Sequence, residues 1–340
     1  MVSSYKAVKA PPEIELELET IGTTKSNLSF SSMFVLAILA GVYIGFGGAL
    51  STIATHDLAQ YVGIGCAKLI GGVVFSIGLI LVLLGGAELF TGNNLLVIPL
   101  FSHKIRISKV LRNWGIVYIG NFVGAILLVL LVFFSGYWKI NSAQVGIKAI
   151  EIANGKVNLS FLEAFVRGIL CNWLVCLAVW LSIAAKDIIG KIFGILFPIT
   201  AFVAMGFEHC IANMYFIPLG LLLKNLNSPI YSLDLSGLTW SSFFLNNLLP
   251  VTLGNVVGGT FFVGFLYWFA YRKKVKTSAE ELKLEQVQSL LETENGIESI
   301  TEKLEKYSLH TFVNKSEKEA EEEMEEEQKL FPRVESVQKP

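Results

Sequence analysis

Residues 206–220 read GFEHCIANMYFIPLG and place an acid, an imidazole, an amide and a proline between two strongly apolar runs. Ionisable side chains at membrane depth are costly, and those that occur there face a cavity or the protein interior. The stretch therefore indicates a membrane helix interrupted by polar residues. Its Glu208, His209 and Asn213 are candidate site residues.

A second stretch, GAELFTGNNLLVIPL at residues 86–100, resembles the first. With an offset of 120 residues, Glu88 aligns with Glu208 and Asn93 aligns with Asn213. An interrupted helix frees backbone groups, which protein or pore water must satisfy at membrane depth. Paired interruptions in corresponding halves predict a substrate site near the midplane of the membrane.

The composition is that of a membrane protein. Of the 340 residues, 53% are apolar, only 16% are charged, and thirty are glycines, which suit close helix packing. All four cysteines lie in apolar segments and are expected to be structural thiols: Cys66, Cys171, Cys176 and Cys210. The polar residues 1–28 give no indication of a cleavable signal peptide. No metal, cofactor or nucleic-acid partner is expected.

Six apolar segments reach the roughly 20 residues that cross a bilayer. They are residues 30–52, 65–101, 114–136, 161–184, 192–223 and 248–271. The second is interrupted at residues 85–94 and the fifth at residues 206–213. Ser160 and Glu163 have the spacing of a capping box, which predicts where the fourth segment begins.

The repeat extends beyond the interruptions, because GNFVGA at residues 120–125 in the third segment matches GNVVGG at residues 254–259 in the sixth. Each half is thus a unit of three spans. Three is odd, so the second unit must enter the membrane from the opposite side. The sequence predicts an all-α membrane protein with six transmembrane helices in two inverted three-helix repeats, helices 2 and 5 being broken.

Loop charges predict the orientation. Lysine and arginine are denser in the connections after the second and fourth spans and after the sixth, so both termini are expected in the cytoplasm. We expect a cytoplasmic segment at residues 1–29, a channel domain at 30–272 in the plasma or inner membrane, and an acidic cytoplasmic tail at 273–340. Seventeen of the 28 acidic residues fall after residue 276. That composition predicts a largely disordered tail with a helix at residues 280–291, or a regulatory segment that binds a partner.

Several motifs in order carry a resemblance to a known family. They are KLIGGVVFSIGLI (68–80), ELFTGN (88–93), GNFVGA (120–125), ILCNWLVCLAVW (169–180), GFEHCIANMYFIP (206–218) and NNLLPVTLGN (246–255). Over about residues 30–272 the chain resembles the formate/nitrite transporter family, and within it the formate channels. The resemblance implies an aquaporin-like fold, a homopentamer with one pore in each protomer, and passage of small monovalent anions with protons.

The resemblance also implies pore residues. His209 is similar to the central pore histidine, whose imidazole titrates near neutrality and can give or take a proton; the alternative is a packing histidine. Thr91 supplies a hydroxyl in the matching interruption, able to donate or accept. Asn172 and Asn213 add amides, which either line the pore or satisfy backbone groups freed by the breaks.

Four apolar side chains match the family's constrictions above and below the histidine: Phe75, Leu79, Leu89 and Phe202. The alternative is that these side chains only pack or face lipid. Lys156 matches the lysine that flanks the outer vestibule, where a cation concentrates anions unless it is merely solvated.

Carboxylates lining an anion path would repel the substrate. Glu88 and Glu208 are therefore predicted to support the interrupted segments by accepting hydrogen bonds from backbone amides and nearby polar groups. Arg167 lies where an apolar residue is expected. It is predicted to reach the membrane interface or to pair with Glu163, outside the pore.

These features predict a channel or transporter for formate and related small monovalent anions, bidirectional and proton-linked, embedded in a lipid bilayer. A nitrite or hydrosulfide channel of the same family is the alternative. An aquaporin-like water channel lacks support because neither interruption contains an Asn-Pro-Ala sequence. An intramembrane enzyme would need a nucleophile and base or metal ligands at depth, and it is not expected because His209 has no second buried histidine to accompany it.

Overall fold

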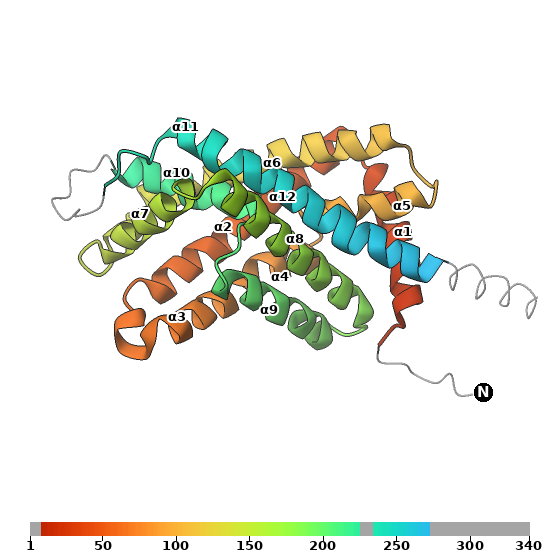
Figure 1. Cartoon of the computed structure of the whole chain (residues 1–340), viewed down its shortest axis with the longest axis horizontal. Helices are drawn as coiled ribbons and strands as arrows, with labels where there is room; N and C mark the ends of the chain where they lie inside the picture. The colour runs from red at the N-terminus through yellow and green to blue at the C-terminus, as the bar shows by residue number, and fades with distance from the viewer. Residues whose placement is uncertain (1–7, 225–233, 273–340) are drawn as a thin grey trace, which may run out of the picture. The chain divides into compact units, whose positions relative to one another are not determined.

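The computed structural model describes residues 8–224 and 234–272 of the chain (Figure 1). Within these ranges the regular structure is helical, apart from one isolated bridge between Val8 and Ala185, so the predicted all-α class is confirmed. The acidic tail and the helix expected at residues 280–291 lie outside the described residues.

Five helical spans within the described ranges are long and apolar enough to cross a membrane. They are α2 (Phe30–Thr55), α3 with α4 (Ala59–Phe75 and Ile77–Leu84), α6 (Ile107–Phe134), α8 (Phe161–Ala184), and the last span, Trp240–Arg272. The last span contains α11 (Trp240–Ser242), the π-helical η3 (Phe243–Leu248), α12 (Leu249–Val257) and the π-helical η4 (Gly258–Phe265). The capping box predicted at Ser160 and Glu163 begins α8 and is confirmed.

Shorter apolar helices complete the apolar segments. They are η1 (Gly92–Leu96) with α5 (Val97–Phe101), α9 (Ile188–Ala204) and α10 (Cys210–Lys224). Residues 85–91 between α4 and η1, and residues 205–209 between α9 and α10, do not continue the helices on either side. These two segments hold five of the eleven candidate site residues: Glu88, Leu89, Thr91, Glu208 and His209.

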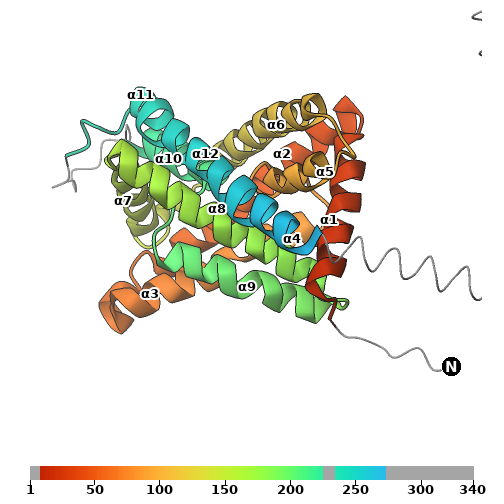
Figure 2. The ribbon, with the colours of Figure 1, turned by 45° about the vertical axis from the view of Figure 1, so that its right-hand side comes forward.

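Two helices lie in regions that the sequence analysis treated only as polar connections. They are α1 (Pro11–Ser26) and α7 (Gln144–Val157), the latter preceded by η2 (Tyr137–Lys139). Each buries apolar side chains four residues apart, such as Ile14 and Leu18 in α1, and this spacing is a helix signal that was present in the sequence. Helix α1 packs against α5 and η1, and α7 packs against α10 (Figure 2).

Glycines allow two pairs of helices to approach closely. Helix α6 packs on α2, and α12 lies alongside α8 (Figures 1 and 2). A Cβ atom at Gly124 would lie 2.0 Å from the carbonyl oxygen of Ile38, and one at Gly254 would lie 2.1 Å from that of Phe165. Only a residue without a side chain fits such contacts. They bring α6 and α12 near the two non-helical segments.

Candidate functional site

One asparagine of α6 satisfies the backbone of the first non-helical segment. The Oδ1 atom of Asn121 accepts the backbone N–H of Phe90 at 2.9 Å. Its Nδ2 atom donates to the carbonyl oxygens of Ala37 and Glu88 at 2.7 and 2.9 Å. Gly86 has a positive φ of 76°, a conformation that glycine adopts without steric cost, and turns the chain out of α4.

Asn255 of α12 holds the second segment in the same way. Its Oδ1 atom accepts the backbone N–H of Cys210 at 2.9 Å, and its Nδ2 atom donates to the carbonyl oxygens of Gly168 and Glu208 at 2.8 and 2.9 Å. Gly206 has a positive φ of 71°. The sequence analysis quoted the Gly-Asn pairs of this repeat but did not select their asparagines, although their recurrence was an available signal.

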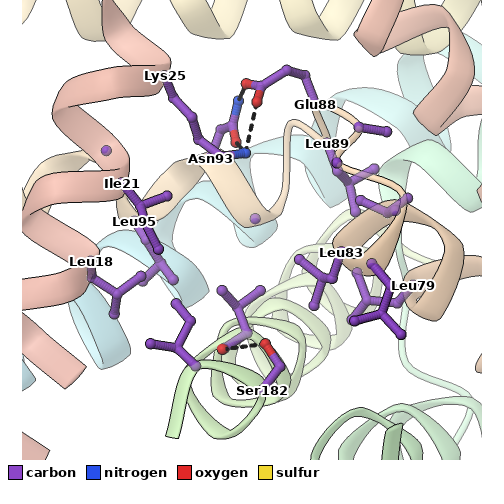
Figure 3. A pocket seen from close by; sticks show the side chains of 18 of the residues that line it. Leu18, Ile21, Lys25, Leu79, Leu83, Glu88, Leu89, Asn93, Leu95 and Ser182 are labelled. Atoms are coloured by element: carbon purple, nitrogen blue, oxygen red, sulfur yellow. Dashed lines mark hydrogen bonds and ion pairs between the residues drawn. The ribbon is translucent and has the colours of Figure 1, made fainter. Parts of the chain in front are cut away.

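The carboxylate of Glu88 is buried and fully partnered (Figure 3). Its Oε1 atom pairs with Nζ of Lys25, from α1, at 2.8 Å. Its Oε2 atom accepts from Nδ2 of Asn93 at 2.7 Å, and the same amide donates to Oδ1 of Asn113 at 2.9 Å. A helix outside the predicted spans therefore supplies the cation that neutralises this acid.

Glu208 has an equivalent set of partners. Its Oε1 atom pairs with Nζ of Lys156 at 2.8 Å, and its Oε2 atom accepts from the amides of Asn213 and Asn247 at 2.7 and 3.1 Å. Of the two kinds of partner predicted for these glutamates, the neighbouring polar groups are present and the backbone amides are not among the hydrogen bonds of the described residues. Asn121 and Asn255 bind backbone groups of both segments, so the carboxylates bind lysines and side-chain amides instead.

Lys156 is thus paired rather than free. Its side chain is 16% exposed and lies on the wall of a cavity, with Nζ 5.5 Å from the ring centroid of Phe216. The sequence analysis predicted a cation that concentrates anions at the outer vestibule. Here Glu208 offsets much of the charge of Lys156, so less of it is available to attract anions.

Thr91 and His209 meet across the two non-helical segments. The distance between Thr91 Oγ1 and His209 Nε2 is 3.0 Å, and both residues are buried. Nδ1 of the ring accepts the backbone N–H of Ala212 at 3.1 Å. In a neutral ring the proton therefore lies on Nε2 and is donated to the threonine oxygen, which leaves the threonine hydroxyl proton free to bind an anion.

Two cavities flank this contact. The larger, of about 690 Å³, is lined by His209, Phe75 and Phe202 among others. The smaller, of about 230 Å³, is lined by Leu79 and Leu89 and by Lys25, Glu88 and Asn93 (Figure 3). The candidate site residues predicted from the sequence thus line two separate cavities.

The four predicted constriction residues line the two hollows, Phe75 and Phe202 the larger one and Leu79 and Leu89 the smaller one. The rings of Phe75 and Phe202 meet edge to face with centroids 5.8 Å apart, and Phe202 stacks on His209 at 6.0 Å. Phe75 and Leu79 are one helical turn apart, a rise of about 6 Å. Apolar side chains one helical turn apart therefore line the two cavities.

The two predicted pore asparagines have different surroundings. Asn213 lines the larger cavity. Asn172 is fully buried, is not part of the lining of either hollow described above, and donates to Oδ1 of Asn94 and to the carbonyl oxygens of Thr91 and Asn255 at 2.7–3.2 Å. The geometry of Asn172 thus matches the alternative in which it satisfies backbone groups.

Arg167 is part of the lining of the larger cavity, whereas the sequence analysis predicted a position outside the pore. It lines the larger cavity together with His209, and its partly buried side chain forms no ion pair with Glu163 in the described part of the chain. The Glu163 carboxylate instead accepts from the backbone N–H and hydroxyl of Ser160 at 3.0 and 2.8 Å, and Arg167 acts on it only electrostatically. The alternative in which Arg167 reaches the membrane interface stays a prediction.

Comparison with known proteins supports the resemblance. The sequence profile of the formate/nitrite transporters matches residues 12–269. The chain belongs to the formate/nitrite transporter family. A probable formate transporter of Methanothermobacter thermautotrophicus is 42% identical over 289 residues, which cover 81% of this chain and all of that protein. The formate channel FocA of Escherichia coli (strain K12) is 40% identical over 263 residues, 75% of this chain and 92% of that protein.

A solved structure agrees with the fold of this formate/nitrite transporter. A pentameric formate channel with formate bound matches with a TM-score of 0.65 and 38% identity, over 71% of this chain and 97% of that one. This transporter is therefore a membrane protein of a family of channels and transporters, and its helices have the length and apolarity to span a bilayer.

The pair of Lys156 and Glu208 makes a prediction about stability. Lys156→Met leaves a carboxylate that is 5% exposed without its cation, and we expect a loss of roughly 3–5 kcal/mol. Lys156→Met combined with Glu208→Gln should recover most of it, because a neutral amide needs no counter-charge. Thermal unfolding in detergent measures both, with Lys148→Met as control, whose partner Glu151 is exposed. Equal melting temperatures for the two single variants would contradict the prediction.

Proposed function

We propose that this transporter is a channel for formate and related small monovalent anions, passing them in both directions with protons. The observation that carries the proposal is the contact of Thr91 with His209 inside an apolar layer between two cavities. Such a layer would let an anion reach hydrogen-bond donors while it prevents a continuous chain of water molecules through the pore. The relatives named as formate channels favour formate as the substrate.

The free energies favour passage of the neutral acid. An unpaired carboxylate in a dry passage costs several kcal/mol even after relaxation. Protonating an acid with a pKa of about 4 at neutral pH costs only about 4 kcal/mol. A second proton on the His209 ring would displace the Ala212 N–H from Nδ1. The ring therefore acts first as a hydrogen-bond donor, and the anion takes its proton from that donor or from water in the cavities.

Nitrite and hydrosulfide remain alternative substrates. Both are small monovalent anions that can accept the hydroxyl proton of Thr91. The residues around the contact are apolar and compact, so they restrict size more than they select one anion.

The whole assembly is part of the proposal. We infer that α2 to α6 and α8 to η4 are two inverted repeats of three spans, with the second and fifth spans broken, and that five copies assemble as in the matched pentameric channel. The paired asparagines Asn121 and Asn255 support this reading. Residues 30–272 then form the channel domain, with cytoplasmic segments at 1–29 and 273–340.

The proposed orientation in the plasma or inner membrane is tested by thiol labelling. In cells whose outer surface alone is exposed to an impermeant reagent, Gln144→Cys should label and Lys104→Cys should not, since the lysine-rich loop faces the cytoplasm. Both positions are exposed to solvent in the protomer. The reverse pattern would overturn the topology.

Flux into proteoliposomes tests the function. Formate should enter and leave vesicles that contain the protein faster than protein-free vesicles, with an accompanying pH change. Acetate, nitrite and hydrosulfide measured in the same vesicles rank the substrates. Formate flux equal to that of protein-free vesicles across a range of pH, with folded protein, would refute the proposal.

His209→Asn tests the role of the imidazole. Asparagine can accept the Ala212 N–H and donate to Thr91, so we expect a folded protein that conducts anions but loses the increase in formate uptake at low external pH. Uptake at several external pH values measures this, and Thr91→Ser, which keeps the hydroxyl, should keep the pH profile. An unchanged rate and pH profile in His209→Asn would make the ring a packing residue.

A further inference from the structure

Arg167 lies beside the candidate site and has no role in the function proposed above. Its backbone carbonyl accepts the N–H of Glu208 at 3.2 Å, directly before His209 in the chain. The residue is partly buried and is part of the lining of the larger cavity, with His209 and Lys156. Arg167 therefore belongs to the same hollow as the proposed pore residues.

The backbone contact of Arg167 does not require its charge. In the first half of the chain the carbonyl of Leu36 accepts the N–H of Glu88, also at 3.2 Å. Leucine thus fills the corresponding position without loss of that hydrogen bond. A cation within a membrane span is costly and tends to mark a substrate path, so an arginine where leucine suffices needs a separate explanation.

The charges of the larger cavity do not balance. Four cationic side chains line it: Lys68, Lys148, Lys156 and Arg167. Of these, Lys156 is paired with Glu208, and Lys148 with Glu151 at 3.2 Å. In residues 8–224 and 234–272, neither Lys68 nor Arg167 forms an ion pair, and Arg167 influences Glu163 only at longer range. Lys68 is exposed, whereas Arg167 is partly buried.

We propose that Arg167 is a binding site for planar anions with two oxygens, carboxylates above all, in the larger cavity ahead of the apolar layer. The guanidinium presents parallel N–H donors that match the two oxygens of a carboxylate, whereas a lysine offers a point charge. The inference rests on the proposed anion transport and names the chemical class selected there. Arg167 captures the anion, and Thr91 with His209 receives it.

A capture site outside the layer makes a specific kinetic prediction. Arg167 should set the formate concentration that gives half-maximal uptake and should leave the maximal rate nearly unchanged, because it binds the anion before the slow passage. We expect Arg167→Lys to raise that concentration several-fold, on the order of 3- to 10-fold, since it keeps the charge but loses the paired donors. Arg167→Met should raise it further.

Lys68→Met is the matched control, since it removes an exposed cation from the same cavity wall. A general attraction of anions by the wall is screened by salt, whereas a direct contact is screened much less. In proteoliposomes with an impermeant salt, the effect of Lys68→Met should therefore disappear at about 0.5 M ionic strength. The effects of Arg167→Lys and Arg167→Met should persist.

The outcomes separate this inference from the proposed function. Wild-type flux above protein-free vesicles supports transport itself. If that flux is present but Arg167→Lys behaves like the wild type, or if the effect of Arg167→Met vanishes with salt like that of Lys68→Met, the binding site is refuted and transport stands. If Arg167→Met fails to assemble, the conservative Arg167→Lys alone decides. Absence of wild-type formate flux refutes both proposals.

Discussion

The structure depends on satisfying backbone hydrogen bonds where the chain leaves the helix inside an apolar bundle. Each unsatisfied backbone group in hydrocarbon costs several kcal/mol, so a non-helical segment at that depth needs dedicated partners. Asn121 and Asn255 each provide three hydrogen bonds to backbone groups at or beside such a segment. They reach these groups because Gly124 and Gly254 let their helices pack closely on α2 and α8. The candidate site is possible because this scaffold leaves Thr91 and His209 free to face each other.

Charge neutralisation follows from the same constraint. Glu88 and Glu208 are almost fully buried, and each is paired with a lysine and bound by side-chain amides. Burying an ionised carboxylate alone would cost several kcal/mol, and the paired arrangement also removes much of the negative field that would repel an anion. In the larger cavity the two acids are offset by two lysines, and the charge left over is positive. This excess of positive charge in the larger cavity supports the proposed role of Arg167 in binding.

Much of this arrangement was predictable because it repeats in the sequence. The two polar stretches, with their glutamates and asparagines, follow from similar motifs 120 residues apart, whereas Thr91 and His209 were selected through the family resemblance. The predictions failed where a side chain had several acceptable partners. The glutamates bind lysines and amides rather than backbone N–H groups, and Arg167 lines the cavity rather than pairing with Glu163. Helix α1, which supplies Lys25, was missed because four glutamates between residues 13 and 19 made the segment look merely polar.

The sequence by itself determined the class of the protein, because apolar segments of sufficient length can be satisfied in a bilayer only as helices, and because the family motifs are contiguous in the chain. It also determined which residues are chemically able to handle an anion and a proton. Only the tertiary structure decided which of them share a cavity and which are hydrogen-bonded or ion-paired to one another. Asn172 is occupied by backbone and side-chain oxygens, and Lys156 is held by Glu208. Arg167, part of the lining of the larger cavity, forms no ion pair within residues 8–224 and 234–272. The physical reason is that hydrogen-bond and ion-pair partners are chosen by distance in space, and partners at this site lie as far as 118 positions apart in the chain.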